Sequence, residues 1–319
     1  MARSSLKGKR VLITGASGFI GANLLRESVN QGAQAFIFVR KDSNLWRIRD
    51  ILSSAKKIQV DLGNPRRLKN ILKQIRPQII LHAAAYGTRP EATDFKRIIE
   101  ANLKGTASLL DCCLDLDFEL FVNTGSSSEY GIKKILMREK DSLNPATPYG
   151  ISKAIATLYA QNLARIENKP IVTLRLFSPY GYYEAINRLI PAVIISCLKK
   201  EDISLSSAAS VRDFVFIEDV MSAYKKAYER RSEIKGEIFN IGSGLQYTVG
   251  DIVSRIIKLT NSKIRLKWSS LDSSRIEPKH WQADIRKARE QLHWQPAYSL
   301  DKGLSRTIDW FKKNRRLYC

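Results

Sequence analysis

Continuously apolar runs alternate with helical patterns through the first half of this 319-residue chain. In order, the runs read RVLIT, AFIFV, KIQV, QIILH, FELFV and IVTLRLF. A strand that is hydrophobic along its whole length has to be covered on both faces, and a helix between two such strands supplies the crossover of a parallel sheet. The alternation therefore predicts an α/β fold built on a doubly wound parallel sheet.

A glycine-rich segment, TGASGFIG, lies between the first apolar run and the first helical pattern. Gly15 permits a tight turn, Gly18 lets the backbone approach a pyrophosphate, and Gly21 lets the helix pack closely against the sheet. At the first strand–helix junction of such a series, this spacing predicts a dinucleotide-binding Rossmann domain. The residues of the segment that we expect to bind the cofactor are Gly15, Ser17, Gly18, Phe19, Ile20 and Gly21.

The end of the second apolar run bears on the choice of cofactor. AFIFV ends at Val39, about 20 residues past the glycine loop, where a domain selective for NAD normally presents Asp or Glu to the ribose 2′-hydroxyl. This chain reads RKDS there. Arg40 and Lys41 suit a 2′-phosphate, so the sequence favours NADP. NAD stays possible, because Asp42 could swing in as a displaced acidic residue.

The regular alternation ends near Tyr180, and shorter pieces such as EIFNIGSG and KIRLKW follow. We expect residues 1–180 to form the dinucleotide-binding domain, with later segments returning to it. Residues 181–319 are expected to form mainly a smaller C-terminal lobe that binds the substrate. With 44% hydrophobic residues, a chain of this length can bury a core of that size.

The formal net charge of +22 is spread along the chain and is not concentrated in one block. Such a field favours anionic ligands. Because no recognisable nucleic-acid-binding module accompanies the charge, we do not expect nucleic acid as the main partner.

No apolar run approaches the roughly 20 residues that a membrane-spanning helix needs, and MARSSLKGKR leads directly into the first run. We therefore expect a cytoplasmic protein without membrane insertion. The cysteines show no CxxC spacing and no nearby histidine, so the sequence indicates neither a disulfide framework nor a metal site. They are Cys112, Cys113, Cys197 and Cys319.

Tyr149 and Lys153 lie four residues apart in TPYGISK, at the start of a helical pattern from about Pro148 to Glu167. This spacing places both side chains on one helix face. A free phenol has a pKa near ~10, and we expect a neighbouring ammonium to lower it. Tyr149 would then exchange a proton with a carbinol or carbonyl oxygen, although a lysine four after a tyrosine is also common on helix surfaces.

Seven motifs together resemble the extended short-chain dehydrogenases that modify nucleotide sugars. They are TGASGFIG, NLKGT, GSSSEYG, YGISK, RDFVFIEDV, FNIGSG and LHWQP. The chain is similar, from about Lys9 to Trp310, to UDP-galactose 4-epimerases, dTDP-glucose 4,6-dehydratases and 4-keto reductases of CDP- or dTDP-deoxysugars. The resemblance implies a Rossmann domain, a substrate lobe, a nucleotide-diphosphate sugar as ligand and usually a homodimer.

The resemblance also implies roles for individual residues. Ser126 falls on the catalytic hydroxyl position and would hydrogen-bond the sugar oxygen alongside Tyr149, while Lys153 would bind the nicotinamide ribose. His82, in LHAAAYG, is more typical of a structural histidine than of a catalytic one. Asp61 either accepts from the adenine amino group or starts an ordinary turn. The further residues expected near the cofactor are Asp61, Leu62, Ala83, Ala84 and Asn102, the last also a structural asparagine with core hydrogen bonds.

For the substrate, Arg212 in VRDFVFIEDV matches the arginine that pairs with the nucleotide diphosphate in this family. A guanidinium suits that role because its fork meets phosphate oxygens bidentately. Arg188 and Arg275 are further candidates, each of which could instead be a surface arginine. The complete set of residues expected at the substrate is Ser127, Ser128, Ser178, Arg188, Arg212 and Arg275.

Two departures from the family pattern narrow the chemistry. Ser127 and Ser128 stand where the 4,6-dehydratases carry acids, and an alcohol is not a general base near neutral pH without strong activation. Glu129 could rescue dehydration only if the loop had a different register. Ser178 replaces the usual asparagine after the sixth apolar run, so the family's sugar contacts do not transfer in detail.

The leading interpretation is an NADPH-dependent 4-keto reductase of a nucleotide-linked deoxysugar in cell-surface polysaccharide biosynthesis. A reductase consumes NADPH, whereas epimerases and dehydratases of this family usually keep NAD bound. The alternatives are a nucleotide-sugar 4-epimerase with retained NAD, a 4,6-dehydratase and a non-catalytic dinucleotide sensor. The intact set of Ser126, Tyr149 and Lys153 favours an enzyme over a sensor.

Overall fold

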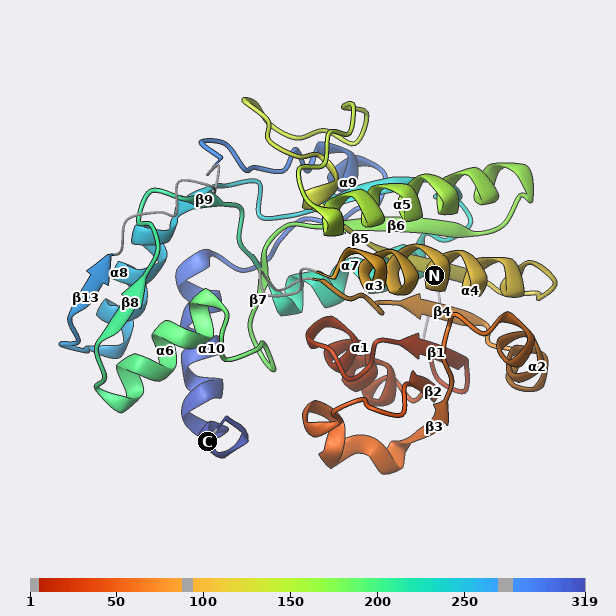
Figure 1. Cartoon of the computed structure of the whole chain (residues 1–319), viewed down its shortest axis with the longest axis horizontal. Helices are drawn as coiled ribbons and strands as arrows, with labels where there is room; N and C mark the ends of the chain where they lie inside the picture. The colour runs from red at the N-terminus through yellow and green to blue at the C-terminus, as the bar shows by residue number, and fades with distance from the viewer. Residues whose placement is uncertain (1–5, 88–93, 269–277, 319) are drawn as a thin grey trace.

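The computed structural model describes residues 6–87, 94–268 and 278–318. Its centre is a seven-stranded sheet in the order β11-β6-β5-β4-β1-β2-β3 (Figure 1), and all neighbouring strands of this sheet run parallel. These strands are β1 Arg10–Thr14, β2 Gln34–Val39, β3 Ala55–Gln59, β4 Ile79–His82, β5 Leu120–Ser126, β6 Ile171–Leu176 and β11 Ile238–Ile241. The doubly wound parallel sheet expected from the sequence is confirmed.

Helices cover both faces of the sheet. Along β1, Val11 and Ile13 belong to one apolar cluster with α1 and α7, whereas Leu12 belongs to a second cluster with α2, α4 and α5. This alternation follows from the two-residue period of a strand and explains why the runs are apolar throughout. The helices are α1 Phe19–Asn30, α2 Pro65–Ile75, α4 Gly105–Leu114, α5 Pro148–Ile166 and α7 Ile217–Glu229.

The helical segment over residues 95–114 contains a wide turn. It begins as α3 Phe95–Ile99, continues as a π-helical turn over Glu100–Lys104 and ends as α4. Asn102 lies in this turn, where its side chain accepts from Tyr86 N and donates to Tyr86 O and to Ser152 Oγ. The predicted core hydrogen bonding of Asn102 is thereby confirmed. Turns of this kind are frequent at functional sites.

The strand order reverses between β1 and β4. β1 pairs with β2 on one side and with β4 on the other, so the loops that follow β1 and β4 diverge at the carboxyl edge of the sheet. In open α/β sheets ligands bind in the crevice at this position. The glycine loop, residues 15–21, follows β1.

The C-terminal part forms a second group of helices and short strands (Figure 1). Three two-stranded ladders join β7 to β10, β9 to β12 and β8 to β13. The first apolar cluster runs without a break from the sheet into α6, α8 and α10. The elements are β7 Pro179–Tyr180, α6 Leu189–Lys199, β8 Ile203–Leu205, β9 Val211–Arg212, β10 Val215–Phe216, β12 Tyr247–Thr248, α8 Val249–Thr260, β13 Leu266–Trp268, α9 Arg286–Glu290 and α10 Leu300–Lys313.

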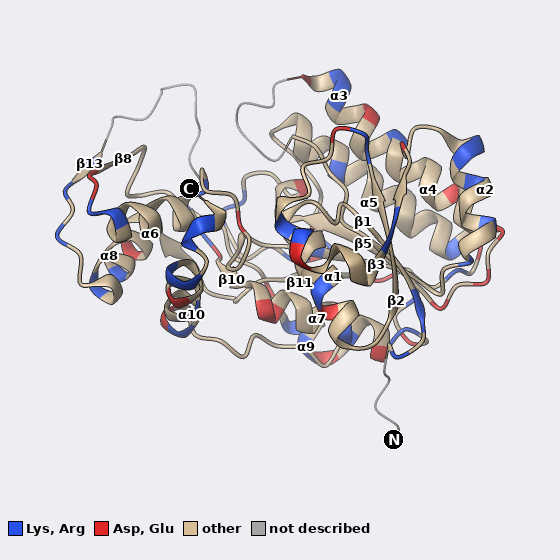
Figure 2. Cartoon of the chain, turned by 90° about the horizontal axis from the view of Figure 1, so that it is seen from below, with Lys and Arg blue, Asp and Glu red and all other residues tan. Residues whose placement is uncertain are grey.

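Lysines and arginines are distributed over elements of both parts of the chain, among them α2, α8 and α10 (Figure 2). Among the described helices, none combines the length and the apolar character that crossing a membrane requires. Cys112, Cys113 and Cys197 are buried free thiols.

Candidate active site

The glycine loop packs directly against the end of β4. A Cβ at Gly15, which has φ +71°, would lie 2.6 Å from the backbone of Ala83 and Ala84. A Cβ at Gly21 would lie 2.1 Å from the carbonyl oxygen of Gly15, and one at Gly18 would lie 3.2 Å from it. Side chains at these three positions are therefore excluded or crowded, and the backbone at the start of α1 is open to close approach by a phosphate. This cradle fits a dinucleotide.

Hydrogen bonds from Arg47 and packing against the apolar core hold the glycine loop in place. Arg47 donates from Nη1 to Ser17 O at 3.2 Å and from Nε to Tyr183 O at 2.7 Å. Phe19 and Ile20, in the first turn of α1, are partly buried against the apolar core. The predicted loop residues are thus gathered at the crevice, and Arg47 ties them to the segment that follows β7.

The chain beyond β2 carries a cation where many dinucleotide-binding domains carry an acid. Arg40 directly follows the strand, its backbone N–H donates to Ser43 Oγ at 2.9 Å, and its Nε lies 3.4 Å from Asp42 Oδ1. The other Asp42 oxygen lies 3.9 Å from Arg97 Nη2. Lys41 is exposed beside this group. The carboxylate of Asp42 is therefore already engaged by two cations.

Asp61 lies just beyond β3 and uses its carboxylate locally. Its Oδ1 accepts from Gly63 N at 2.8 Å, as a turn-starting aspartate does. Of the two interpretations of this residue, the contact supports the turn. Leu62 is partly buried against α4, near Gly105.

Helix α5 positions the tyrosine and the lysine. Thr147 caps the helix by accepting from Gly150 N at 3.0 Å, and Pro148 occupies the first helical position, which fixes where the first turn begins. Tyr149 is half-buried, while Lys153, one turn later, is only 2% exposed. The side chain of Ser126, at the end of β5, hydrogen-bonds the Tyr149 phenol. The structure therefore brings together all three residues predicted to be catalytic.

Electrostatics in this group differ from the expectation for Tyr149. Burial raises the pKa of Tyr149 to about 12, although the hydrogen bond with Ser126 and the charge of Arg188 act in the opposite direction. The prediction that Lys153 lowers the pKa of this phenol is wrong, because burial dominates. Burial lowers the pKa of Lys153 to about 8, against the opposing effect of Glu129. At neutral pH Tyr149 is accordingly a protonated phenol beside a protonated lysine.

His82 is a structural histidine, as predicted. Its ring lies between Thr14 Oγ1 at 2.7 Å and Thr106 Oγ1 at 2.9 Å. Burial, followed by the charge of Lys153, lowers its pKa to about 3, so the imidazole is neutral.

The segment NTGSSSEYG contains the end of β5, the hydroxyl of Ser126 and the cap of the turn that follows. β5 extends through Ser126 because it pairs with β6 as far as Leu176. A short 3-10 turn over Ser127–Glu129 follows, and Ser126 and Glu129 cap it reciprocally. Glu129 is fully buried in an ion pair with Arg175, so this register does not offer it as a base to the site.

The residues expected at the substrate are partly linked to one another. Ser127 Oγ accepts from Trp281 Nε1 at 3.1 Å, and the guanidinium of Arg212 lies 5.4 Å from the centre of a Trp281 ring. Arg188, at the start of α6, is half-buried and acts electrostatically on Tyr149. Ser128 and Ser178 are half-buried beyond the ends of β5 and β6. Arg275 lies outside the described residues.

Sequence reasoning missed Asp213 and Trp281. Asp213 is fully buried and accepts from Ser243 N, Ser243 Oγ, Gly244 N and Ala283 N at 2.6–3.0 Å. It thereby ties the segment carrying Arg212 to the loop after β11 and to the segment that contains Trp281. The available signal was an acid directly before the apolar residues FVF and directly after Arg212 in VRDFVF.

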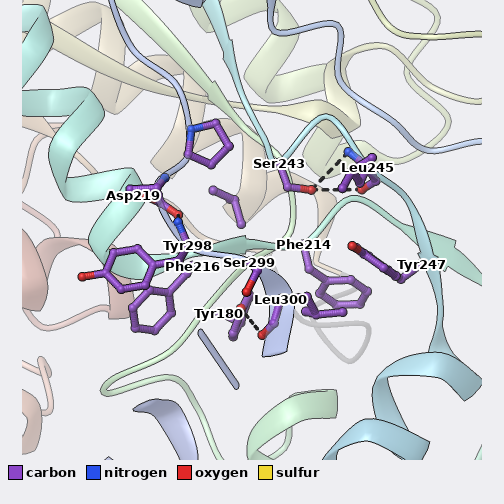
Figure 3. Close-up of a pocket in the computed structure, with 13 residues that line it drawn as sticks. Tyr180, Phe214, Phe216, Asp219, Ser243, Leu245, Tyr247, Tyr298, Ser299 and Leu300 are labelled. Atoms are coloured by element: carbon purple, nitrogen blue, oxygen red, sulfur yellow. Dashed lines mark hydrogen bonds between the residues drawn. The ribbon is translucent and has the colours of Figure 1, made fainter. Parts of the chain in front are cut away.

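A separate cavity of about 260 Å³ lies between the β7–β10 ladder and the start of α10 (Figure 3). Five aromatic side chains contribute to its walls: Phe214 lies beside Tyr247, Phe216 lies beside Tyr298 on the opposite side, and Tyr180 lies between them. The carboxylate of Asp219 accepts from the backbone of residues 297 and 298. None of the residues predicted to bind cofactor or substrate lines this cavity, so the candidate site lies elsewhere.

Among residues 6–87, 94–268 and 278–318, no group of three or more His, Cys, Asp or Glu side chains is arranged to hold a metal ion. The described part of the site instead gathers a phosphate cradle, a phenol, a lysine and a serine hydroxyl.

Comparisons with known proteins agree on one family. Residues 11–242 match the model of the NAD dependent epimerase/dehydratase family. An uncharacterized UDP-glucose epimerase, YtcB, of Bacillus subtilis is 29% identical, over 94% of this chain and 96% of its own length. A dTDP-glucose 4,6-dehydratase of Haemophilus influenzae is 25% identical, over 95% of this chain and 98% of its own length.

Solved structures are similar over the same length. The UDP-glucuronic acid 4-epimerase of Bacillus cereus, in complex with UDP-glucuronic acid and NAD, superimposes with a TM-score of 0.84. It is 27% identical, and the match covers 95% of this chain and 99% of that one.

Proposed function

Because the chain belongs to the NAD dependent epimerase/dehydratase family, we propose that it is an NADPH-dependent reductase of a nucleotide-linked 4-keto sugar. Tyr149 donates a proton to the C4 oxygen, Ser126 hydrogen-bonds that oxygen, and Lys153 holds the nicotinamide ribose. A nicotinamide dinucleotide, when bound in the cradle of the glycine loop, supplies the hydride. Arg212 binds the diphosphate of the sugar nucleotide.

The observation that carries the choice of reduction is the end of β2. Arg40 occupies the position after the strand, and Asp42 is paired with Arg40 and Arg97. A 2′-phosphate would find cations here, whereas the 2′-hydroxyl of NAD would lack the usual carboxylate acceptor.

A second candidate is 4-epimerisation with retained NAD. It is supported by the epimerase relatives and by the bound NAD of the Bacillus cereus enzyme. Dehydration has less support. Ser127 is an alcohol and a poor general base near neutral pH, and Glu129 is engaged in an ion pair with Arg175. A panel of nucleotide 4-keto sugars and nucleotide sugars, incubated with and without NADPH and followed by mass spectrometry, separates these activities. A gain of two hydrogens that requires NADPH supports reduction, and an isomer of unchanged mass formed without added cofactor supports epimerisation.

Cofactor preference provides the first test at a single residue. We expect the wild-type protein to bind NADPH more tightly than NADH, and Arg40→Ala to lose at least about tenfold in NADPH affinity, since a charge-assisted hydrogen bond contributes about 1.5–3 kcal/mol. NADH affinity should change little. Nicotinamide fluorescence titrations measure both. Arg66→Ala, which removes an exposed arginine of α2, serves as the control. Tighter binding of NADH by the wild type, or NAD retained through purification, would move the assignment to the epimerase.

The homodimer implied by the family has a candidate surface on α5. Ile151, Ile155 and Leu158 are 36%, 41% and 52% exposed, and their spacing places them on one face of the helix. An exposed apolar stripe on a stable helix is typical of an interface between subunits. We propose that two copies of the chain pack through this face.

We expect Leu158→Glu to convert a dimer into a monomer, because a buried unpaired carboxylate would be introduced at the interface. Light scattering after size-exclusion chromatography measures the mass directly. Leu245→Glu is a matched control, since Leu245 is 56% exposed and lies in the C-terminal part. A wild-type monomer, or a Leu158→Glu dimer, would exclude this interface.

A further inference from the structure

A buried ion pair contacts Ser126, the residue proposed to carry the catalytic hydroxyl. Arg175, in β6, and Glu129, after β5, are 1% and 0% exposed, and Arg175 Nε donates to Glu129 Oε2 at 2.7 Å. Burying two charges is costly unless both are paired and hydrogen-bonded. A pair of this kind beside a reaction centre therefore calls for an explanation beyond stability.

The other oxygen of Glu129 faces the catalytic elements. Its Oε1 accepts from Ser126 N at 2.7 Å and from Thr157 Oγ1 at 3.0 Å. Thr157 follows Lys153 by one helical turn and Tyr149 by two, so all three lie on one face of α5. The carboxylate thus joins the residue that carries the catalytic hydroxyl to the helix that carries the phenol and the ammonium.

Arg175 anchors the pair on the opposite side. Its Nη1 donates to Tyr130 Oη at 2.9 Å, and Tyr130 Oη in turn donates to Asn240 Oδ1, in β11, at 2.7 Å. The guanidinium meets Oε2, whereas α5 meets Oε1, so Arg175 lies on the far side of the carboxylate from that helix. β5, β6, β11 and α5 are consequently connected through the hydrogen-bonded side chains of Glu129, Arg175 and Tyr130.

We propose that Glu129 is a positioning residue of the active site: its buried carboxylate fixes Ser126 against α5 and places a negative charge on the face of that helix that carries Lys153. This inference rests on the proposed function for the roles of Ser126 and Lys153. In this proposal Glu129, which follows β5, is an anion that acts on Lys153 and not on the substrate.

The charges around Lys153 fix the direction of the effect. Burial lowers the pKa of Lys153 to about 8, and Glu129 is the group that opposes this. From β4, His82 faces the lysine as a neutral ring, and from α5 itself Tyr149 is a protonated phenol. On its other side Glu129 faces Arg175 and the phenol of Tyr130. Lys153 is therefore charged below pH 8 and loses its proton above it. Without the Glu129 charge, the proton would leave at a lower pH.

The test is the pH dependence of cofactor binding in Glu129→Gln. The amide keeps the size of the side chain and an oxygen that can accept from Ser126 N and Thr157, but it carries no charge. NADPH dissociation constants, measured by fluorescence from well below to well above pH 8, give the midpoint at which affinity is lost. We expect this midpoint to fall by about one pH unit relative to the wild type. Affinity at low pH should remain close to that of the wild type.

Thr157→Val is the matched control. It removes one hydrogen bond to Glu129 without changing any charge, so the midpoint should stay at the wild-type value. A purely structural role of Glu129 would weaken binding equally at every pH, and an unchanged midpoint in Glu129→Gln would overturn the proposal. The readout needs no sugar substrate, so it remains valid if reduction of a 4-keto sugar is not observed.

Glu129→Gln leaves Arg175 without its counter-ion, which endangers folding. The double variant Glu129→Gln/Arg175→Met removes both charges. Its pH midpoint of NADPH affinity can then be compared with that of the wild type. Because Arg175 lies farther from α5 than the carboxylate does, the midpoint should still fall, by less than in the single variant. Circular dichroism melting establishes that each variant is folded. A folded double variant with the wild-type midpoint would also overturn the proposal.

Discussion

Replacing Tyr149 with phenylalanine is expected to lower turnover at least about a hundredfold and to leave cofactor affinity nearly unchanged. The ring still packs at the start of α5, but the hydroxyl proposed to donate the proton to the C4 oxygen is missing. Because the pKa of Tyr149 is raised to about 12, the wild-type phenol holds its proton at neutral pH and is ready to donate it. Steady-state rates with a nucleotide 4-keto sugar and NADPH measure the loss, and fluorescence titration measures the affinity.

Tyr159→Phe is a suitable control for that substitution. Tyr159 lies on the same helix, but its phenol donates to Asp111 at the surface of α4. Its removal should leave turnover within about twofold of the wild type, as is usual for a surface side chain remote from the chemistry. Near wild-type turnover in Tyr149→Phe would exclude Tyr149 as the proton donor.

The largest expected effect on stability comes from Asp213→Ala. The substitution leaves the buried N–H group of Ala283 and the half-buried N–H groups of Ser243 and Gly244 without their acceptor. Each unsatisfied buried group costs about 1–3 kcal/mol, so we expect a loss of at least about 3 kcal/mol in the free energy of unfolding. Urea denaturation followed by circular dichroism measures it.

Asp202→Ala provides the comparison for Asp213. Asp202 is exposed and binds Arg265 at the edge of the C-terminal part. An exposed pair of this kind contributes about 0–1 kcal/mol. If the two variants lose similar amounts of stability, Asp213 does not organise the three segments in the way described.

The sequence predicted those features that local spacing determines. The glycine loop, the alternation of apolar runs and the four-residue interval between Tyr149 and Lys153 each reflect the geometry of a single turn, strand or helix. Their positions in the structure follow the prediction closely, and the doubly wound sheet brings the loop, Ser126 and α5 to one edge.

Contacts between distant parts of the chain were not predictable in this way. Ser127 meets Trp281 across 154 positions, and Glu129 meets Arg175 across 46. No periodicity links such residues. Neither the packing of Trp281 beside Arg212 nor the buried ion pair could therefore be inferred from the sequence. The same reason explains the error about Tyr149: the sequence places a lysine on its helix face, but it does not reveal that burial outweighs every nearby charge.

Strand β11 has a consequence for how the protein is made. Residues 238–241 form the outermost strand beside β6, although β6 itself ends at Leu176. While the chain emerges from the ribosome, one edge of β6 therefore stays without its backbone partner until the residues between Leu176 and Ile238 and β11 itself have been synthesised. Such an open, apolar edge is a template for pairing with other nascent chains. Completion of the nucleotide-binding sheet is thus a late event of biosynthesis, and the interval before it is when the unfinished chain most needs protection by a chaperone.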